Sequence, residues 1–197
     1  HRCTELSAAD IGKTVTVMGW TQRHRNLGGL IFVDLRDRSG IVQIVFSETE
    51  TDSELFRKAA SIRHEDVLAV VGKVRRRAPE ALNPRMKTGE IEILATELRI
   101  LSRSDDLPVQ IEENSNVNEA TRLKYRYLDL RRPDMQANLM LRHRVAKITR
   151  DYFDENGFLE IETPMLIKSS PEGARDYLVP SRVHPGKFYA LPQSPQL

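Results

Sequence analysis

The sequence predicts an α+β protein, in which a five-stranded β-barrel is followed by a hinge and by the start of a second domain that opens with a long helix. Residues 14–101 contain short apolar runs with the alternating period of β-strands. Their predicted order is three strands, one helix and two strands. That order matches an OB-fold barrel, although large antiparallel sheets can contain the same elements. Residues 134–156 instead repeat apolar side chains with the period of an α-helix.

Each element of the barrel has a local signal of its own. Runs of β-branched and apolar residues predict strands at Thr14–Arg23, Leu30–Arg36, Ile41–Phe46, Val67–Arg76 and Glu90–Leu101. Glycine-containing turns join the first three strands. Leu55, Ala59 and Ile62 recur at helical spacing, which predicts a helix over Ser53–Arg63. The barrel domain is therefore expected to span residues 1–103.

A hinge is predicted over residues 104–132, because they show no sustained periodicity. Basic and aromatic residues interleave in Lys124–Pro133. Such a tract suits docking on an anionic partner, or it can be a structural linker whose arginine stems cover apolar surface.

Residues 133–197 are expected to begin a second domain. Pro133 and Asp134 favour the start of a helix over 134–156. Its apolar stripe, which faces either a core or a partner, consists of Leu141, Val145, Ile148 and Tyr152. A strand is predicted over Gly157–Thr163, and Pro164 ends it.

Composition narrows the possible classes of protein. The chain has 197 residues, of which 40% are hydrophobic and 29% charged, as is typical of a globular protein. No run of about 18 apolar residues occurs, so no membrane span is expected. Cys3 is the only cysteine, which excludes an internal disulfide, indicates a reducing compartment such as the cytoplasm, and is interpreted as an inert thiol. His1 in place of Met indicates that at least one initial residue is missing.

Charge is unevenly distributed along the chain. Between Arg122 and Arg150 there are nine Lys or Arg residues and two acids. A polyanionic partner would exploit this segregation, although a solvated charged face gives the same pattern.

Strand alternation predicts a binding face on the barrel. Ile31, Val33 and Leu35 should face the core, so Phe32 should point outward. The same argument turns Gln43 and Glu90 outward. The rim of this face is expected to hold Arg23, Arg25 and Arg75. Phe can stack on an unpaired base, Gln and Glu can bond base edges, and Arg can hold phosphates. The alternative is that Phe32 packs under a loop or the helix.

Two groups of motifs resemble the class II aminoacyl-tRNA synthetases, and most closely the bacterial-type aspartyl family. The helix that runs into a strand ending at Pro164 is similar to motif 1 of that class, and the loop Glu172–Asp176 and the run Gln193–Gln196 are similar to the motifs that follow it. Gly19–Arg23 and Gly40–Gln43 resemble the family's anticodon-binding barrel.

The resemblance implies an aspartate–tRNA ligase that activates L-aspartate with ATP and Mg²⁺ and transfers it to tRNA. It also implies that residues 133–197 begin the antiparallel-sheet catalytic domain of that class. In the barrel, it implies that Phe32 stacks on the central anticodon base. It further implies that the anticodon is contacted by Arg25, Gln43, Arg75 and Glu90. It places L-aspartate against Glu172, Ser194 and Gln196, and a homodimer interface at Pro164.

The resemblance also implies that this chain alone is inactive. The sequence ends before motifs 2 and 3, which carry the main ATP and Mg²⁺ ligands of the family. No residues here are assigned a catalytic or metal-binding role, and the histidines lack metal-ligand spacing. An asparaginyl or lysyl synthetase, and a non-enzymatic nucleic-acid-binding barrel, are the alternatives.

Overall fold

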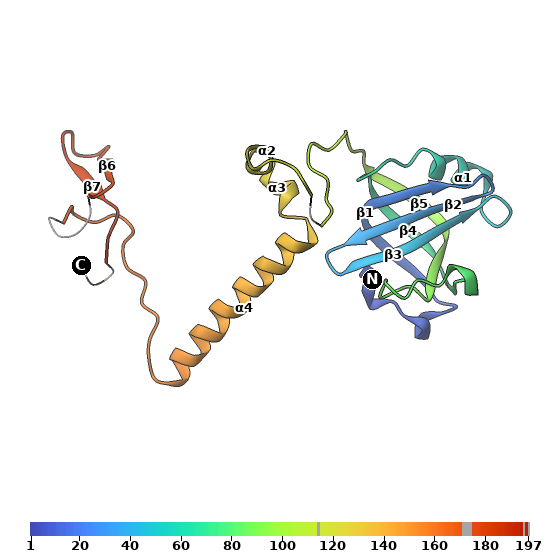
Figure 1. The fold of residues 1–197 in the computed structure, drawn as a ribbon, viewed down its shortest axis with the longest axis horizontal. Helices are drawn as coiled ribbons and strands as arrows, with labels where there is room; N and C mark the ends of the chain where they lie inside the picture. Colours follow the sequence, from blue (N-terminus) through green and yellow to red (C-terminus); the bar gives the residue numbers. More distant parts are fainter. Residues whose placement is uncertain (114, 171–174, 195, 197) are drawn as a thin grey trace. The chain divides into compact units, whose positions relative to one another are not determined.

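The computed structural model describes residues 1–113, 115–170, 175–194 and 196. The chain divides into two compact units, His1–Gln110 and Ile111–Leu197 (Figure 1). The boundary between the units falls within the predicted hinge, residues 104–132.

The first unit is a closed barrel of five strands in the order β1-β2-β3-β5-β4 (Figure 1). The strands are β1 (Thr14–Asn26), β2 (Leu30–Asp37), β3 (Gly40–Ser47), β4 (Val67–Arg76) and β5 (Ile91–Ser102), and helix α1 (Ser53–Ala60) lies between β3 and β4. All neighbouring strands pair antiparallel except β3 and β5, which are parallel. This is the arrangement of an OB-fold, so the predicted barrel is confirmed.

The barrel core follows from strand alternation. Ile31, Val33 and Leu35 are fully buried, as predicted, and they pack with apolar residues from every other strand. Helix α1 closes part of this core with Ala59, and the side chain of Asp52 caps its first turn by accepting hydrogen bonds from two backbone N–H groups. The core therefore fixes which side chains of each strand face solvent.

An N-terminal segment with short 3₁₀ turns at Cys3–Glu5 and Ala8–Asp10 packs on the turn between β2 and β3. The Asp37 carboxylate accepts hydrogen bonds from the backbone N–H groups of Cys3, Ser39 and Gly40. Cys3 is fully buried, and this burial, followed by the charge of Asp37, raises the pKa of its thiol to about 12. A buried thiol with so high a pKa is unreactive, which supports the sequence interpretation.

The second unit contains helices α2 (Glu119–Lys124), α3 (Arg126–Asp129) and α4 (Pro133–Glu155) and a hairpin of β6 (Leu178–Pro180) and β7 (Phe188–Ala190). The long helix agrees with its predicted bounds to within one residue. The two short helices were not predicted, since a helix of one or two turns leaves too few residues to show a period. Asn118 starts α2, because its side chain accepts a hydrogen bond from the backbone N–H of Thr121.

The predicted strand Gly157–Thr163 is wrong. These residues form no regular element and are all exposed. A strand exists only by pairing with another backbone, and the described part of the chain offers none to this segment. The hairpin β6–β7 that follows was not predicted. Pro164 is also exposed.

The predicted apolar stripe on α4 lies at the surface of this unit. Leu141, Val145, Ile148 and Tyr152 are each more than half exposed. Among the described residues, no helix is both long and apolar enough to cross a membrane.

Candidate nucleic-acid interface

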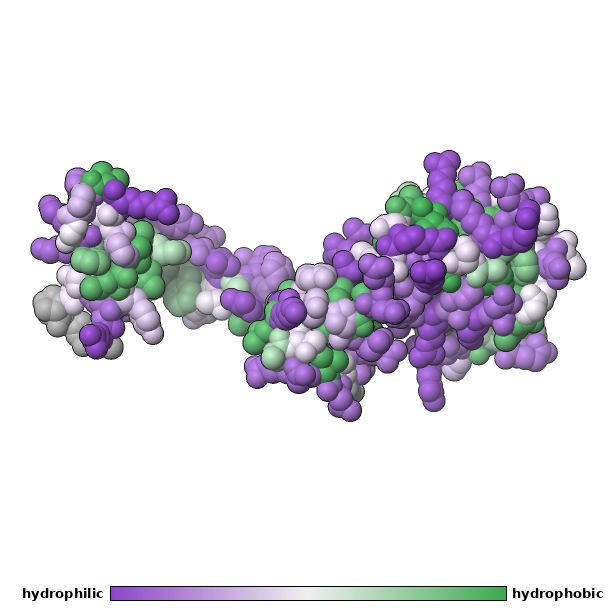
Figure 2. Space-filling view, turned by 90° about the horizontal axis from the view of Figure 1, so that it is seen from above, coloured by the Kyte–Doolittle hydropathy of each residue, from purple (hydrophilic) through white to green (hydrophobic). Residues whose placement is uncertain are grey.

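Strand pairing assembles two rows of side chains across the outer face of the barrel. In the first row, Arg23, Asp34 and Gln43 pair across β1, β2 and β3, and Glu92 and Arg75 pair across β5 and β4. The two parts adjoin where β3 and β5 pair, because Gln43 and Glu92 directly precede the partners Ile44 and Ile93. The second row consists of Arg25, Phe32, Val45, Leu94 and Lys73. Both rows carry a cation at each end. The first has carboxylates and an amide between its cations, and the second has apolar side chains there. Figure 2 shows hydrophilic residues over much of the barrel surface seen in that view.

Phe32 lies on this outer face, as strand alternation predicted. It is half-buried, whereas its neighbours Ile31 and Val33 are fully buried. The guanidinium carbon of Arg25 lies 5.6 Å from the centre of the Phe32 ring. Arg25 Nη2 also donates to Asp34 Oδ1 at 3.4 Å. At such a surface the aromatic ring can stack on a base while the neighbouring cation attracts the phosphate of that nucleotide.

Arg75 is held by two carboxylates of different exposure. Its Nε donates to Glu92 Oε1 at 2.7 Å, and its Nη1 donates to Glu50 Oε2 at 2.9 Å. Burial alone would lower the pKa of Arg75, but the hydrogen bonds that Arg75 donates to Glu50 and Glu92 outweigh it, so the pKa is raised. The Glu92 side chain is 8% exposed, whereas that of Glu50 is 49% exposed.

Gln43 points to the predicted face but is not presented at its surface, because its residue exposure is only 5%. Its strand, β3, lies between β2 and β5, and every residue from Val42 to Ser47 is buried. Gln43, which was predicted to point away from the core, is nevertheless buried. Alternation gives the direction of a side chain, but its neighbours decide its exposure.

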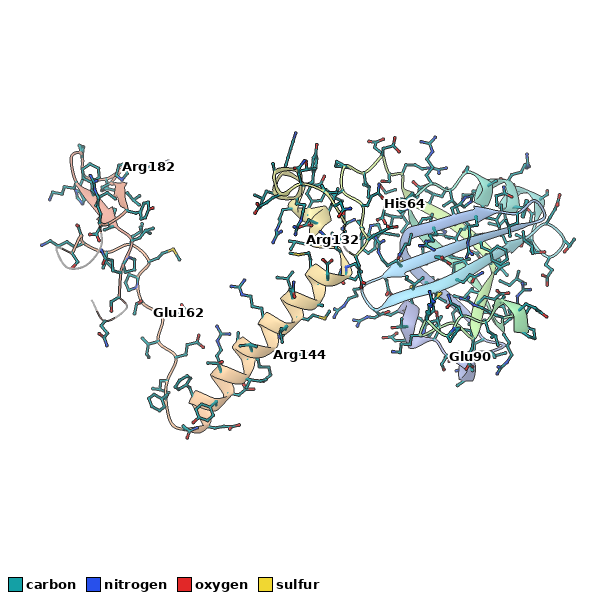
Figure 3. All side chains as sticks on the ribbon, in the orientation of Figure 1. His64, Glu90, Arg132, Arg144, Glu162 and Arg182 are labelled. Atoms are coloured by element: carbon teal, nitrogen blue, oxygen red, sulfur yellow. The ribbon has the colours of Figure 1, made fainter. Side chains whose placement is uncertain are left out.

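Glu90 lies apart from Arg75 in its contacts. It precedes β5 by one residue, is exposed, and has its carboxylate 3.9 Å from Arg76 Nη1. It lines a pocket with Ser7, Thr88 and other residues of the N-terminal segment and the loop before β5. Figure 3 places Glu90 at the end of the barrel opposite His64. The carboxylates that contact Arg75 are Glu92 and Glu50, whereas Glu90 lies near Arg76.

Three arginines of the second unit are held by one buried carboxylate of the same unit. The Asp129 carboxylate is fully buried and accepts hydrogen bonds from Arg122 Nε at 2.9 Å, Arg126 Nη1 at 2.7 Å and Arg132 Nη1 at 3.1 Å. The hydrogen bond from Arg122 is the main cause that lowers the pKa of Asp129. Arg132, labelled in Figure 3 at the start of α4, is itself buried. This arrangement favours the structural interpretation for these arginines.

The predicted aspartate-binding residues are only partly described. Glu172 lies outside the described residues. Ser194 and Gln196 are joined by a hydrogen bond from the Gln196 backbone N–H to Ser194 Oγ at 3.3 Å. Asp176, to which no role was given, accepts hydrogen bonds from Ser169 Oγ at 2.7 Å and Gln193 Nε2 at 2.6 Å. It thereby links the two stretches of sequence that carry the predicted contacts.

No site for a metal ion is found in the described part of the chain, where no group of three or more His, Cys, Asp or Glu side chains lies close enough to bind one. The described residues therefore include no set of ligands that fits the Mg²⁺ that the resemblance implies.

Two family models match most of the chain. Residues 15–101 match the OB-fold nucleic acid binding domain of the tRNA anticodon type, and residues 118–197 match the class II tRNA synthetases (D, K and N). Residues 102–117 separate the two matched ranges, and the first compact unit ends among them, at Gln110.

Curated relatives are similar over the whole chain. The aspartate–tRNA ligase of Ruminiclostridium cellulolyticum is 72% identical over 197 residues, and the aspartate–tRNA(Asp/Asn) ligase of Thermoanaerobacter pseudethanolicus is 64% identical over the same length. The chain spans about a third of the length of these relatives, since it covers 33% of each.

Solved structures of two synthetases are also similar over the whole chain. Asparaginyl-tRNA synthetase from Pyrococcus horikoshii, solved with asparaginyl-adenylate, matches with a TM-score of 0.83 and 26% identity, covering 100% of this chain and 43% of that one. A putative aspartyl-tRNA synthetase from Leishmania major also gives a TM-score of 0.83, with 25% identity, covering 100% of this chain and 38% of that one.

Proposed function

Because this chain belongs to the class II aminoacyl-tRNA synthetases of the D, K and N group, we propose that the whole protein is an aspartate–tRNA ligase and that the barrel unit binds the anticodon of its tRNA. The observation that carries the anticodon proposal is the outer face of the barrel, where Phe32 and Arg25 of the second row lie beside the first row, which contains Arg75. The high identity to aspartate-specific relatives supports L-aspartate as the amino acid.

In this proposal an unpaired anticodon base stacks on the exposed part of the Phe32 ring. Stacking of this kind contributes about 1–3 kcal/mol per base and tolerates any base, so neighbouring polar groups must supply selectivity. Gln43 can offer little to a base, because only 5% of the residue is exposed. Arg25 and Arg75 contact the backbone, and exposed Glu90 contacts a base farther along the loop.

The second unit takes part in the amino-acid site and the homodimer. We assign Glu172, Ser194 and Gln196 to the amino group of L-aspartate, since a carboxylate and polar oxygens suit an ammonium ion. The exposed stripe of α4 and Pro164 belong to the homodimer interface, because so large an apolar surface needs a cover. A ligase that charges tRNA acts where tRNA is used, so the cytoplasm is the proposed location.

The whole protein would join L-aspartate to ATP, release pyrophosphate and pass the aspartyl group to tRNA. ATP and Mg²⁺, when bound, supply the activated phosphate and its charge neutralisation. The residues of this chain bind and orient L-aspartate and tRNA. The chain alone is proposed to lack ligase activity.

Two measurements test the proposal. The chain should bind a synthetic RNA stem-loop with the aspartate anticodon more tightly than a stem-loop with the same stem and an altered triplet. It should show no aspartate-dependent exchange of pyrophosphate into ATP. Equal affinity for the two RNAs would overturn anticodon recognition, and clear exchange would overturn the assignment of the chain alone as inactive.

A further inference from the structure

We propose that Glu50 is a displaceable counterion of Arg75. A phosphate of the bound RNA replaces Glu50 on the Arg75 guanidinium, while Glu92 stays in place and fixes the orientation of that guanidinium. This inference rests on the proposed function, because it concerns how the same face of the barrel admits RNA.

The two carboxylates differ in how firmly they are held. Glu92 lies on β5 directly opposite Arg75 on β4, and its side chain is 8% exposed. Removing the partner of so buried a charge is costly, so the Glu92 contact should persist when a ligand binds. Glu50 follows β3 in the turn that leads to α1, and its side chain is 49% exposed. An ion pair of that exposure is weak and screened by salt.

The geometry of Arg75 allows this exchange. Glu92 occupies Nε, and Glu50 occupies Nη1, so the two carboxylates take different N–H groups of the guanidinium. A phosphate that takes the place of Glu50 can bind the outer N–H groups without disturbing the bond to Glu92. Arginine binds phosphate through its planar fork of donors, so an orientation fixed beforehand loses less entropy on binding.

The exchange has a measurable consequence. In the free protein Glu50 neutralises the charge that RNA needs, so Glu50 should weaken RNA binding. Loss of its charge should tighten binding by about two- to fivefold, the range that corresponds to one exposed ion pair.

The test compares Glu50→Gln with Glu48→Gln in the full chain, using the aspartate-anticodon stem-loop as the probe. Glu48 is the matched control because it lies two residues away, is exposed, and forms no ion pair among the described residues. Both variants change the net charge equally. We expect Glu50→Gln to bind the RNA two- to fivefold more tightly than Glu48→Gln, a range given by about one exposed ion pair. Equal affinities would overturn the proposal.

A double-mutant cycle isolates the pair. In an Arg75→Ala background, Glu50→Gln should change the affinity no more than Glu48→Gln does, because its partner is gone. An undiminished effect of Glu50→Gln there would refute the exchange on Arg75. If the unchanged chain does not bind the stem-loop at all, the proposed function fails. If it binds but the two variants are equal, only the counterion inference fails.

Discussion

Replacing Phe32 by Ala removes the one aromatic ring of the second row, which runs from Arg25 to Lys73 across the outer face of the barrel. The backbone should tolerate this change, because the buried neighbours Ile31 and Val33 keep their places in the core. Half-burial of a Phe side chain contributes about 1 kcal/mol to stability, about half the value for full burial. Loss of the contact with Arg25 adds about 0.5–1 kcal/mol. The barrel should therefore remain folded with a lowered midpoint of thermal unfolding.

The effect on RNA binding should be larger than the effect on folding. A lost stacking platform costs about 1–3 kcal/mol per base, which is about a 5- to 150-fold rise in Kd. The dependence of affinity on salt should not change, because the ring contacts no phosphate. Titration of the fluorescently labelled aspartate-anticodon stem-loop at several salt concentrations measures both quantities.

A matched variant separates stacking from general damage to the fold. Phe32→Tyr retains the ring and should bind the stem-loop with nearly the original affinity. Circular dichroism and thermal unfolding would show whether each variant is folded. An unchanged Kd for a folded Phe32→Ala variant would refute the role of this ring in binding RNA.

Three further predictions concern the barrel unit. Arg75→Ala should flatten the slope of log K against log[salt] by about one unit, since one phosphate contact is lost; an unchanged slope would remove Arg75 from the interface. Burial would raise the pKa of the Asp66 carboxyl, but hydrogen bonds from two backbone N–H groups and from Arg103 lower it. The ionised carboxylate therefore stabilises the fold above the unfolded pKa of about 3.9, and this stability is lost as the pH falls through the folded pKa. Thermal unfolding should therefore show Asp66→Asn less stable at pH 7 and less sensitive to acid below about pH 4, and a wild-type loss of stability between pH 8 and pH 6 would contradict this assignment. Cys3, fully buried with a pKa of about 12, should react with iodoacetamide far more slowly in the native chain than in urea, and equal rates would show that the N-terminal segment is detached.

The barrel could be predicted from sequence because its signals are local and agree with one another. Alternation on β2 gave the core positions and the outward direction of Phe32 correctly. The register across strands could not be predicted. The parallel pairing of β3 with β5, which places Ile44 beside Ile93 and thereby brings Gln43 and Glu92 into one row, joins residues about fifty positions apart. The antiparallel register of β4 and β5, which sets Glu92 opposite Arg75, could not be predicted either.

Two other differences have physical causes. The predicted strand after α4 has the right residue pattern, but a strand needs a paired backbone, and sequence pattern does not report whether one is present. The hinge was expected to be irregular, yet the buried Asp129 gathers three arginines around two short helices. Charge counting along the sequence could not separate arginines that contact a ligand from arginines that neutralise a neighbour.

The most direct test of the central claim is an NMR titration of the chain with the aspartate-anticodon stem-loop, in which backbone amide shifts are mapped on the barrel. The account predicts that the largest changes occur at Arg25, Phe32 and Arg75 and their neighbours on the same face. The account would be contradicted by shift changes confined to other parts of β1 and β4, such as Met18 and Val71. It would also be contradicted by the absence of any shift change at the highest RNA concentration.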